Sequence, residues 1–153
     1  MYTMKRTLFI VLALIIGISA SAQFVARMQV KGDIAGICDK NEVYVLMASF
    51  KGQIKAVCPV TNDSILKRLN SEVVFVKENP NYSDKGMVGV VINCKGEVVQ
   101  CEMDNKTKKQ ELDKQIVTVF NSLGGWKAGK LNGHEVDSSR LFSFKINNGV
   151  FSF

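Results

Sequence analysis

The chain has 153 residues, with 20 lysine and arginine residues against 14 aspartate and glutamate residues, and a formal net charge of +6. The basic residues are scattered, and their longest cluster, Lys106 to Lys109, has the composition of a solvated turn before a helix. A small, scattered charge does not build the concentrated positive surface that a nucleic-acid interface requires. We therefore expect no nucleic-acid partner.

The N-terminus has the layout of a secretory signal peptide. Lys5-Arg6 precedes an apolar run from Leu8 to Ile18, and Ala20-Ser21-Ala22 supplies small residues in an A-x-A pattern. We expect cleavage before Gln23 and an exported mature protein. The alternative is an uncleaved anchor, because Leu8 to Val25 is just long enough to span a bilayer, and the protein is membrane-bound only in that case.

Four cysteines follow this cleavage site: Cys38, Cys58, Cys94 and Cys101. An even number of cysteines in an exported chain predicts structural disulfides, and buried free thiols are the alternative. The four residues allow three connectivities. The chain has no C-x-x-C pair and a single histidine far from the cysteines, so we expect no metal and no cofactor.

The N-terminal half contains two predicted elements. Glu42 to Phe50 and Gln53 to Val57 are rich in β-branched and aromatic residues and flank a Lys51-Gly52 turn, which predicts a β-hairpin. Apolar residues then recur at helical spacing from Ile65 to Val76, after N-cap candidates at Thr61 to Ser64. This second pattern predicts a helix.

The clearest hairpin signal joins Met87 to Asn93 with Glu97 to Met103. The turn between them is Cys94-Lys95-Gly96, in which Gly96 can adopt a positive φ. An apolar stripe from Leu112 to Leu123 follows at helical spacing and predicts a second helix, which ends at Gly124-Gly125.

The hairpin geometry makes one disulfide pairing unfavourable. Cys94 lies at the turn, and Cys101 lies about four residues down the return strand, or roughly 13 Å away. A disulfide needs Cα atoms within roughly 7 Å. We therefore expect Cys94 not to pair with Cys101. A bridge to Cys38 or Cys58 would tie the N-terminal segment to this sheet.

The C-terminal segment predicts a strand with two different faces. Phe142, Phe144 and Ile146 alternate with Ser143 and Lys145, which indicates one buried and one exposed face. Asn148-Gly149 is a turn signal that can bring Val150 to Phe153 back as a short partner strand.

Trp126, the only tryptophan, follows the helix stop and is expected to pack in the core. Asn132-Gly133 predicts a turn, and His134 beyond it is expected to be exposed. No motif places a nucleophile or carboxylate beside His134, and the acidic groups Glu97/Glu102/Asp104 and Glu111/Asp113 are assigned to solvent faces. We therefore expect no enzyme and no small-molecule substrate.

From about Asn79 to Phe151 the chain resembles the C-terminal domain of TonB-type energy transducers. The residues that carry the resemblance are GVVINCKGEVVQCEM, then ELDKQIVTVFNSL, then Trp126-Lys127-Ala128, then Leu131-Asn132-Gly133, then Leu141 to Ile146. The resemblance implies an α+β fold with a small antiparallel sheet packed by two helices, in the order strand, strand, helix, strand. The expected organisation is a signal peptide (1–22), an N-terminal hairpin and helix extension (23–78) and a TonB C-terminal-like domain (79–153).

The chain departs from the family pattern at several points. Ala128 stands where the family usually has proline, and Cys94 and Cys101 are not part of the pattern. The Pro-rich spacer of an energy transducer is absent. Phe24 to Asp33 spans roughly 35 Å when fully extended, which is short for a segment that must cross the periplasm.

The resemblance implies a non-enzymatic binding module that accepts a partner segment as an added β-strand. The expected accepting edge comprises Arg140, Leu141, Phe142, Ser143, Phe144, Lys145 and Ile146. The implied partner is an outer-membrane receptor or another envelope protein, and the implied location is the periplasm or cell envelope of a Gram-negative bacterium, with a link to TonB-dependent outer-membrane transport. The alternative is an exported structural protein that self-associates, with this edge covered by Val150 to Phe153 or by the N-terminal hairpin.

Overall fold

The computed structural model describes residues 24–28, 33–40 and 42–153, so the expected signal peptide and its cleavage site lie outside the described residues. The strands are β1 (Ala26–Met28), β2 (Val43–Val45), β3 (Gln53–Ile54), β4 (Asp84–Ile92), β5 (Val98–Asn105), β6 (Gly129–Leu131), β7 (His134–Val136), β8 (Ser138–Asn147) and β9 (Val150–Ser152). The helices are α2 (Asn62–Glu72), α3 (Val74–Glu78) and α4 (Gln110–Asn121). In the described part of the chain, no helix is both long enough and apolar enough to cross a membrane.

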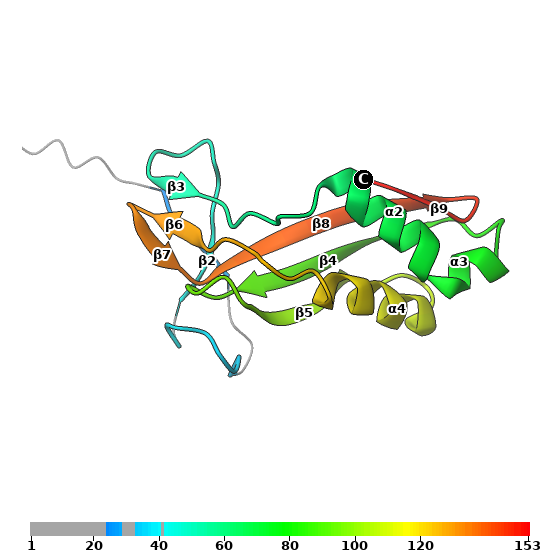
Figure 1. The fold of residues 1–153 in the computed structure, drawn as a ribbon, viewed down its shortest axis with the longest axis horizontal. Helices are drawn as coiled ribbons and strands as arrows, with labels where there is room; N and C mark the ends of the chain where they lie inside the picture. Colours follow the sequence, from blue (N-terminus) through cyan, green and yellow to red (C-terminus); the bar gives the residue numbers. More distant parts are fainter. Residues whose placement is uncertain (1–23, 29–32, 41) are drawn as a thin grey trace, which may run out of the picture.

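The predicted α+β class is confirmed. A six-stranded sheet has the order β1-β2-β8-β4-β5, with β9 also paired to β8. The sheet is mainly antiparallel, but β2 runs parallel to β8. A separate three-stranded sheet has the order β3-β6-β7. The long strands β4 and β8 form the centre of the large sheet, while α2 lies beside β9 and α4 lies beside β5 (Figure 1).

One face of the large sheet and the inner faces of the helices form a single core. Phe142, Phe144 and Ile146 of β8 alternate inward, as a strand with one buried face requires. They join the fully buried Ile116 and Phe120 of α4 in one hydrophobic cluster. This packing fixes the inner face of β8 against the helices.

The predicted helix from Ile65 to Val76 is present, but a break divides it into α2 and α3. Thr61 caps α2, and its side chain accepts a hydrogen bond from the main-chain N–H of Ser64. Val73 interrupts the helix with an extended backbone, at φ −77° and ψ 102°. The fully buried Val73 side chain and this turn redirect the chain into α3.

The predicted hairpin of Met87 to Asn93 with Glu97 to Met103 is confirmed as β4 and β5. The predicted N-terminal hairpin is wrong: β2 pairs with β1 and β8, whereas β3 pairs with β6. The reason lies in the buried side chain of Gln53. It accepts a hydrogen bond from the N–H of Met47 at 2.9 Å and donates one to the carbonyl of Phe24 at 2.6 Å. These bonds hold the connecting loop and leave β2 and β3 in different sheets.

Cys38 and Cys94 form a disulfide with a Cα–Cα distance of 6.0 Å. The expectation that Cys94 does not pair with Cys101 is confirmed. Disulfide formation at all four cysteines is not found, because Cys58 and Cys101 are free thiols that pack against the core. Disulfides persist in oxidising compartments, so the bridge indicates a non-reducing, exported environment.

Candidate functional site

The outer edge of β8 is the candidate site, and its side chains alternate as the sequence predicts. Phe142, Phe144 and Ile146 are 7%, 2% and 0% exposed. Leu141 is 52% exposed, and Ser143 and Lys145 are also exposed. The strand therefore has one face in the core and one face toward solvent.

The hairpin of β8 and β9 shows which main-chain groups point outward. Asn148 and Gly149 both have positive φ, 47° and 73°, as a two-residue hairpin turn requires. Asn147 pairs with Val150 directly across this turn, so the main-chain groups of Asn147 point toward β9. Because these groups alternate along a strand, the odd-numbered residues of β8 face the outer edge and the even-numbered residues face β4.

The opposite end of β8 confirms this alternation. The carbonyl of Asp137 accepts a hydrogen bond of 2.9 Å from the N–H of Tyr44 in β2, on the same outer edge. The register between β4 and β8 is continuous from Asp84 and Ile146 to Ile92 and Ser138. The direction assigned at one end of β8 therefore holds along its whole length.

The middle of this edge has no strand partner among the described residues. β2 pairs with β8 at Ser138, and β9 pairs with it from Lys145 onward. We call the segment between them, Ser139–Phe144, the open edge. Leu141 and Ser143 direct their N–H and C=O groups out of it. At strand rise the open edge is about 20 Å long, and β2 and β9 lie at its two ends (Figure 1).

From the sequence, this edge could be covered by the C-terminal residues or by the N-terminal hairpin, and neither covers the open edge in the described part of the chain. Val150–Ser152 covers only the C-terminal part of the edge, as a partner of residues 145–147. The N-terminal strand β2 covers only its beginning. Of the seven expected edge residues, Lys145 and Ile146 are therefore paired on this side, and Arg140–Phe144 have no strand partner here in the described part of the chain.

Aromatic rings support the inner face of the open edge. The ring of Phe142 lies 5.1 Å from that of Phe120, 6.2 Å from that of Trp126 and 6.2 Å from that of Phe153, measured between centroids. Trp126 is 5% exposed, and its Nε1 donates to the carbonyl of Leu123 at 2.7 Å. The expected core position of Trp126 is confirmed. The buried face of the open edge thus packs on a cluster of aromatic rings.

The side chain of Arg140 interacts with other groups of the same protein. Its guanidinium donates to the carbonyl of Ala56 and lies 5.5 Å from the centroid of the Phe142 ring. Burial lowers the pKa of Arg140 below its usual range. The exposed Lys145 is thus the more accessible cation for an acidic partner.

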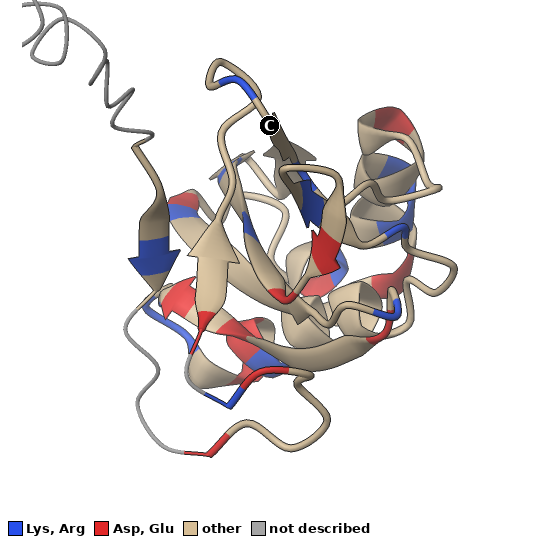
Figure 2. Cartoon of the chain, turned by 90° about the vertical axis from the view of Figure 1, so that its left-hand side faces the viewer, with Lys and Arg blue, Asp and Glu red and all other residues tan. Residues whose placement is uncertain are grey.

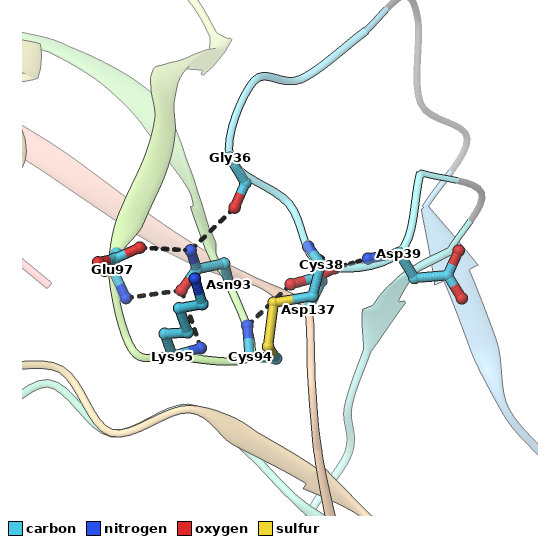
Figure 3. Close-up of a disulfide and its surroundings, with 8 residues drawn as sticks. All are labelled: Gly36, Cys38, Asp39, Asn93, Cys94, Lys95, Glu97 and Asp137. Carbon is cyan, nitrogen blue, oxygen red and sulfur yellow. Dashed lines mark hydrogen bonds between the residues drawn. A yellow bond between two sulfur atoms is a disulfide. The ribbon is translucent and has the colours of Figure 1, made fainter.

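A carboxylate holds the beginning of β8 in place. Asp137 is 2% exposed, and its Oδ2 accepts hydrogen bonds from the N–H groups of Cys38 and Asp39, both at 2.7 Å. Its Oδ1 accepts one from the N–H of Cys94 at 2.8 Å. Figure 3 shows this carboxylate beside the disulfide, so that one side chain ties both cysteine segments to β8.

Asn93 adds a second set of bonds at the same place. Its Nδ2 donates to the carbonyl of Gly36 at 2.9 Å and to Oε2 of Glu97 at 2.7 Å. Its Oδ1 accepts from the N–H groups of Lys95 and Glu97, both at 2.9 Å (Figure 3). We call the assembly of Gly36, Cys38, Asn93, Cys94 and Asp137 the tied corner.

The tied corner is a structural lock in its oxidised form. Cys38, Cys94 and Asp137 each offer an atom, and these atoms lie within 4.8 Å of one another, a spacing that could suit a metal ion. However, both sulfur atoms are in the disulfide, and the carboxylate already accepts three N–H groups. Metal thiolate ligands must be deprotonated cysteines, so this arrangement does not offer them.

Two glycines have the roles expected for turns. Gly96 has φ +82°, and a Cβ atom there would lie 2.4 Å from the carbonyl oxygen of Trp126. Only glycine fits such a contact without displacing the backbone. Gly133 has φ +85° in the turn that joins β6 to β7. The predicted turn at Asn132-Gly133 is confirmed.

The remaining polar residues singled out in the sequence are dispersed. His134 is exposed at the start of β7, as expected. Asp113, which was assigned to a solvent face, is instead 7% exposed. Its carboxylate accepts hydrogen bonds from the N–H and Oγ1 of Thr107, at 3.0 and 2.7 Å, and so fixes the loop before α4.

Asn93 and Asp137 were not identified from the sequence. Asn93 had a local signal, since asparagine before a Lys-Gly turn often bonds the main chain two residues on. Asp137 had no such signal, because its three donors lie 43 to 99 residues away.

Lysine and arginine are interspersed with aspartate and glutamate over strands, helices and loops, as Figure 2 shows for one end of the molecule.

Comparison of the chain with protein-family models, with curated proteins and with solved structures finds no significant match.

Proposed function

We propose that the protein is a non-enzymatic exported binding module that accepts an extended segment of a partner protein at the open edge of β8. The observation that supports this function is the pair of outward-facing residues Leu141 and Ser143, which have no strand partner on that side among the described residues. A partner strand would satisfy their N–H and C=O groups, and each hydrogen bond contributes about 0.5–1.5 kcal/mol net.

The neighbours of the open edge favour a short partner segment. An added strand would lie in line with β2 and β9, which already occupy the two ends of the same edge. Since β2 runs parallel and β9 antiparallel to β8, the edge is compatible with either strand direction. The aromatic support behind Phe142 keeps the strand extended before a partner arrives, which reduces the entropy that binding must overcome.

The cellular setting follows from the resemblance to the TonB C-terminal domain and from the disulfide. We place the protein in the periplasm or cell envelope and expect its partner to be an outer-membrane receptor or another envelope protein. In this setting the protein would take part in TonB-dependent outer-membrane transport. This setting rests on the residues quoted for the resemblance, on the predicted signal peptide and on the Cys38–Cys94 disulfide.

A pair of proline variants tests the proposed edge. The N–H groups of residues 143 and 145 both face outward, but of the two only Lys145 is paired within the described residues, with Ser152. Proline removes an N–H donor and is tolerated where that donor faces solvent. Ser143→Pro should therefore keep a near-native melting temperature and lose partner binding, whereas Lys145→Pro should lower the melting temperature.

The measurement combines thermal melting with crosslinking in envelope extract. A photo-crosslinking amino acid at the exposed position 141 should capture a partner in the otherwise native chain, and Ser143→Pro should abolish this product. If Ser143→Pro unfolds the protein, or if the crosslinked product is unchanged, the proposed edge is wrong.

The alternative function is self-association through the same edge. The observation that favours it is that two copies could pair Leu141 and Ser143 antiparallel about a two-fold axis, because each residue offers both a donor and an acceptor. Sedimentation equilibrium separates the two functions. A dimer that Ser143→Pro converts to a monomer supports self-association, and a native monomer contradicts it.

A further inference from the structure

The opposite edge of the large sheet contains a recess between β5 and α4, which we call the β5–α4 groove. Its volume is about 590 Å³, and its lining includes Cys101, Met103, Lys106, Lys108, Lys114 and Val117. β5 is the last strand of the sheet on this side in the described part of the chain. α4 runs beside β5 (Figure 1).

The register of the sheet shows that β5 offers main-chain groups to this groove. The even-numbered residues of β4 face β8, so Gly89 and Val91 face β5. Gly89 pairs with Glu102, and Val91 pairs with Gln100. Because the direction alternates, Cys101 and Met103 must direct their N–H and C=O groups away from β4 and toward the groove.

The floor of the groove is apolar. Cys101 and Met103 are partly buried and pack against the hydrophobic core, and Val117 of α4 is also partly buried. Burial raises the pKa of Cys101 to about 12. The thiol is therefore protonated at neutral pH and acts as a small apolar surface.

The end of the groove near the start of α4 is positively charged. Lys106, Lys108 and Lys114 are exposed, and none of them belongs to a salt bridge among the described residues. Two carboxylates also line the groove. The carboxylate of Asp113 already accepts hydrogen bonds from Thr107, and Glu102 is exposed on β5. The three lysines outnumber them, which favours an acidic ligand.

We propose that the β5–α4 groove binds an extended acidic segment of a partner polypeptide, added as a strand to β5 between the sheet edge and the helix. The segment receives main-chain hydrogen bonds from Cys101 and Met103, rests its apolar side chains on the groove floor and places its carboxylates near the three lysines. This site is independent of the open edge of β8, so the protein can contact two segments at once.

The test uses an eight-residue peptide that alternates valine with glutamate, with its termini blocked. Its matched control alternates valine with lysine. Amide chemical shifts of the full mature protein report the location of binding, and titration reports the affinity. The Val-Glu peptide should shift the amides of Cys101, Met103 and Val117, and its affinity should fall as salt is raised. The Val-Lys peptide should not bind.

A triple variant tests the charge argument. Replacing Lys106, Lys108 and Lys114 by alanine should weaken the Val-Glu peptide by about tenfold, because each exposed ion pair contributes only a modest amount. Replacing the exposed Lys40, Lys67 and Lys95 by alanine removes the same charge elsewhere and should leave the affinity within about twofold. If the first variant does not fold, the salt titration of the native protein decides the question.

Several results would overturn the proposal. These are equal binding of the two peptides, equal effects of the two triple variants, affinity insensitive to salt, or no binding at millimolar peptide. Shifts centred on Leu141 and Ser143 would assign the peptide to the open edge instead. The variant Ser143→Pro separates the two sites, because it should leave peptide binding in the β5–α4 groove unchanged even if the proposed function of the open edge fails.

Discussion

The beginning and the middle of the outer edge of β8 are held in opposite ways. At its beginning, Ser138 is 1% exposed and lies next to Asp137 in the tied corner, where a disulfide and a buried carboxylate bind the chain. A few residues later, Leu141 and Ser143 have no strand partner on that edge among the described residues. The open edge therefore does not reflect a loose fold, because paired or disulfide-linked structure lies at its two ends and packed aromatic rings lie behind it.

The largest expected effect comes from removing the support behind the open edge. Trp126→Ala should destabilise the protein by about 3–5 kcal/mol, since it creates a cavity beside Phe142 and the ring is buried. His134→Ala is the matched control on an exposed strand and should stay within about 0.5 kcal/mol. Chemical denaturation measures both. A similar loss at both positions would contradict the assignment of Trp126 as the support.

Removing the disulfide should weaken the tied corner, which is the firmly held part of this edge. The double variant Cys38→Ser/Cys94→Ser should lose about 2–5 kcal/mol, as is typical for a native bridge in a small exported domain. The bridge closes a sequence separation of 56 residues. Hydrogen exchange in this variant should show faster opening at positions 38 and 39 than at Phe142 and Phe144. Uniformly faster exchange along all of β8 would show that the two regions are not independent.

The sequence predicted the elements whose signals are local. The β4–β5 hairpin follows from a Lys-Gly turn between two apolar strands, and α4 follows from an apolar stripe that ends at two glycines. The failed N-terminal hairpin had an equally clear turn at Lys51-Gly52, and Gly52 does adopt a positive φ of 79°. Its strands nevertheless separated, because Gln53 bonds to Met47 and to the distant Phe24.

The candidate site was predictable only in part, for a similar reason. The alternation of Phe142, Ser143 and Phe144 established which face is buried, and Asn148-Gly149 indicated a returning strand. The length of the open edge depends on where β2 and β9 stop, which is determined by long-range pairing. The choice of Cys38 as the partner of Cys94 likewise depends on long-range bonds, from Asp137 to the cysteine segments and from Asn93 to Gly36, which no local pattern reveals.

Asp137→Asn provides a smaller change at the tied corner. The amide keeps the shape of the carboxylate but replaces one oxygen by a donor, which then faces the main-chain N–H groups of the cysteine segments. We expect a loss of about 1–3 kcal/mol, with the disulfide still formed. Thermal melting and a non-reduced peptide map check this. If the variant melts like the native protein, the carboxylate does not contribute to the lock.

The smallest expected effect concerns a side chain on the open edge. Ser143 is exposed, and its contribution to partner binding in the proposed function comes from its main-chain N–H and C=O groups. Ser143→Ala keeps both groups, so it should change stability by no more than about 0.5 kcal/mol and retain the crosslinked partner. Ser143→Pro also removes the hydroxyl, but in addition it removes the main-chain N–H and fixes φ, so it should abolish that product. The difference between these two variants isolates the main-chain donor from the side chain. If Ser143→Ala abolished binding while the protein stayed folded, recognition would depend on the hydroxyl group, and strand addition would not be the mode of binding.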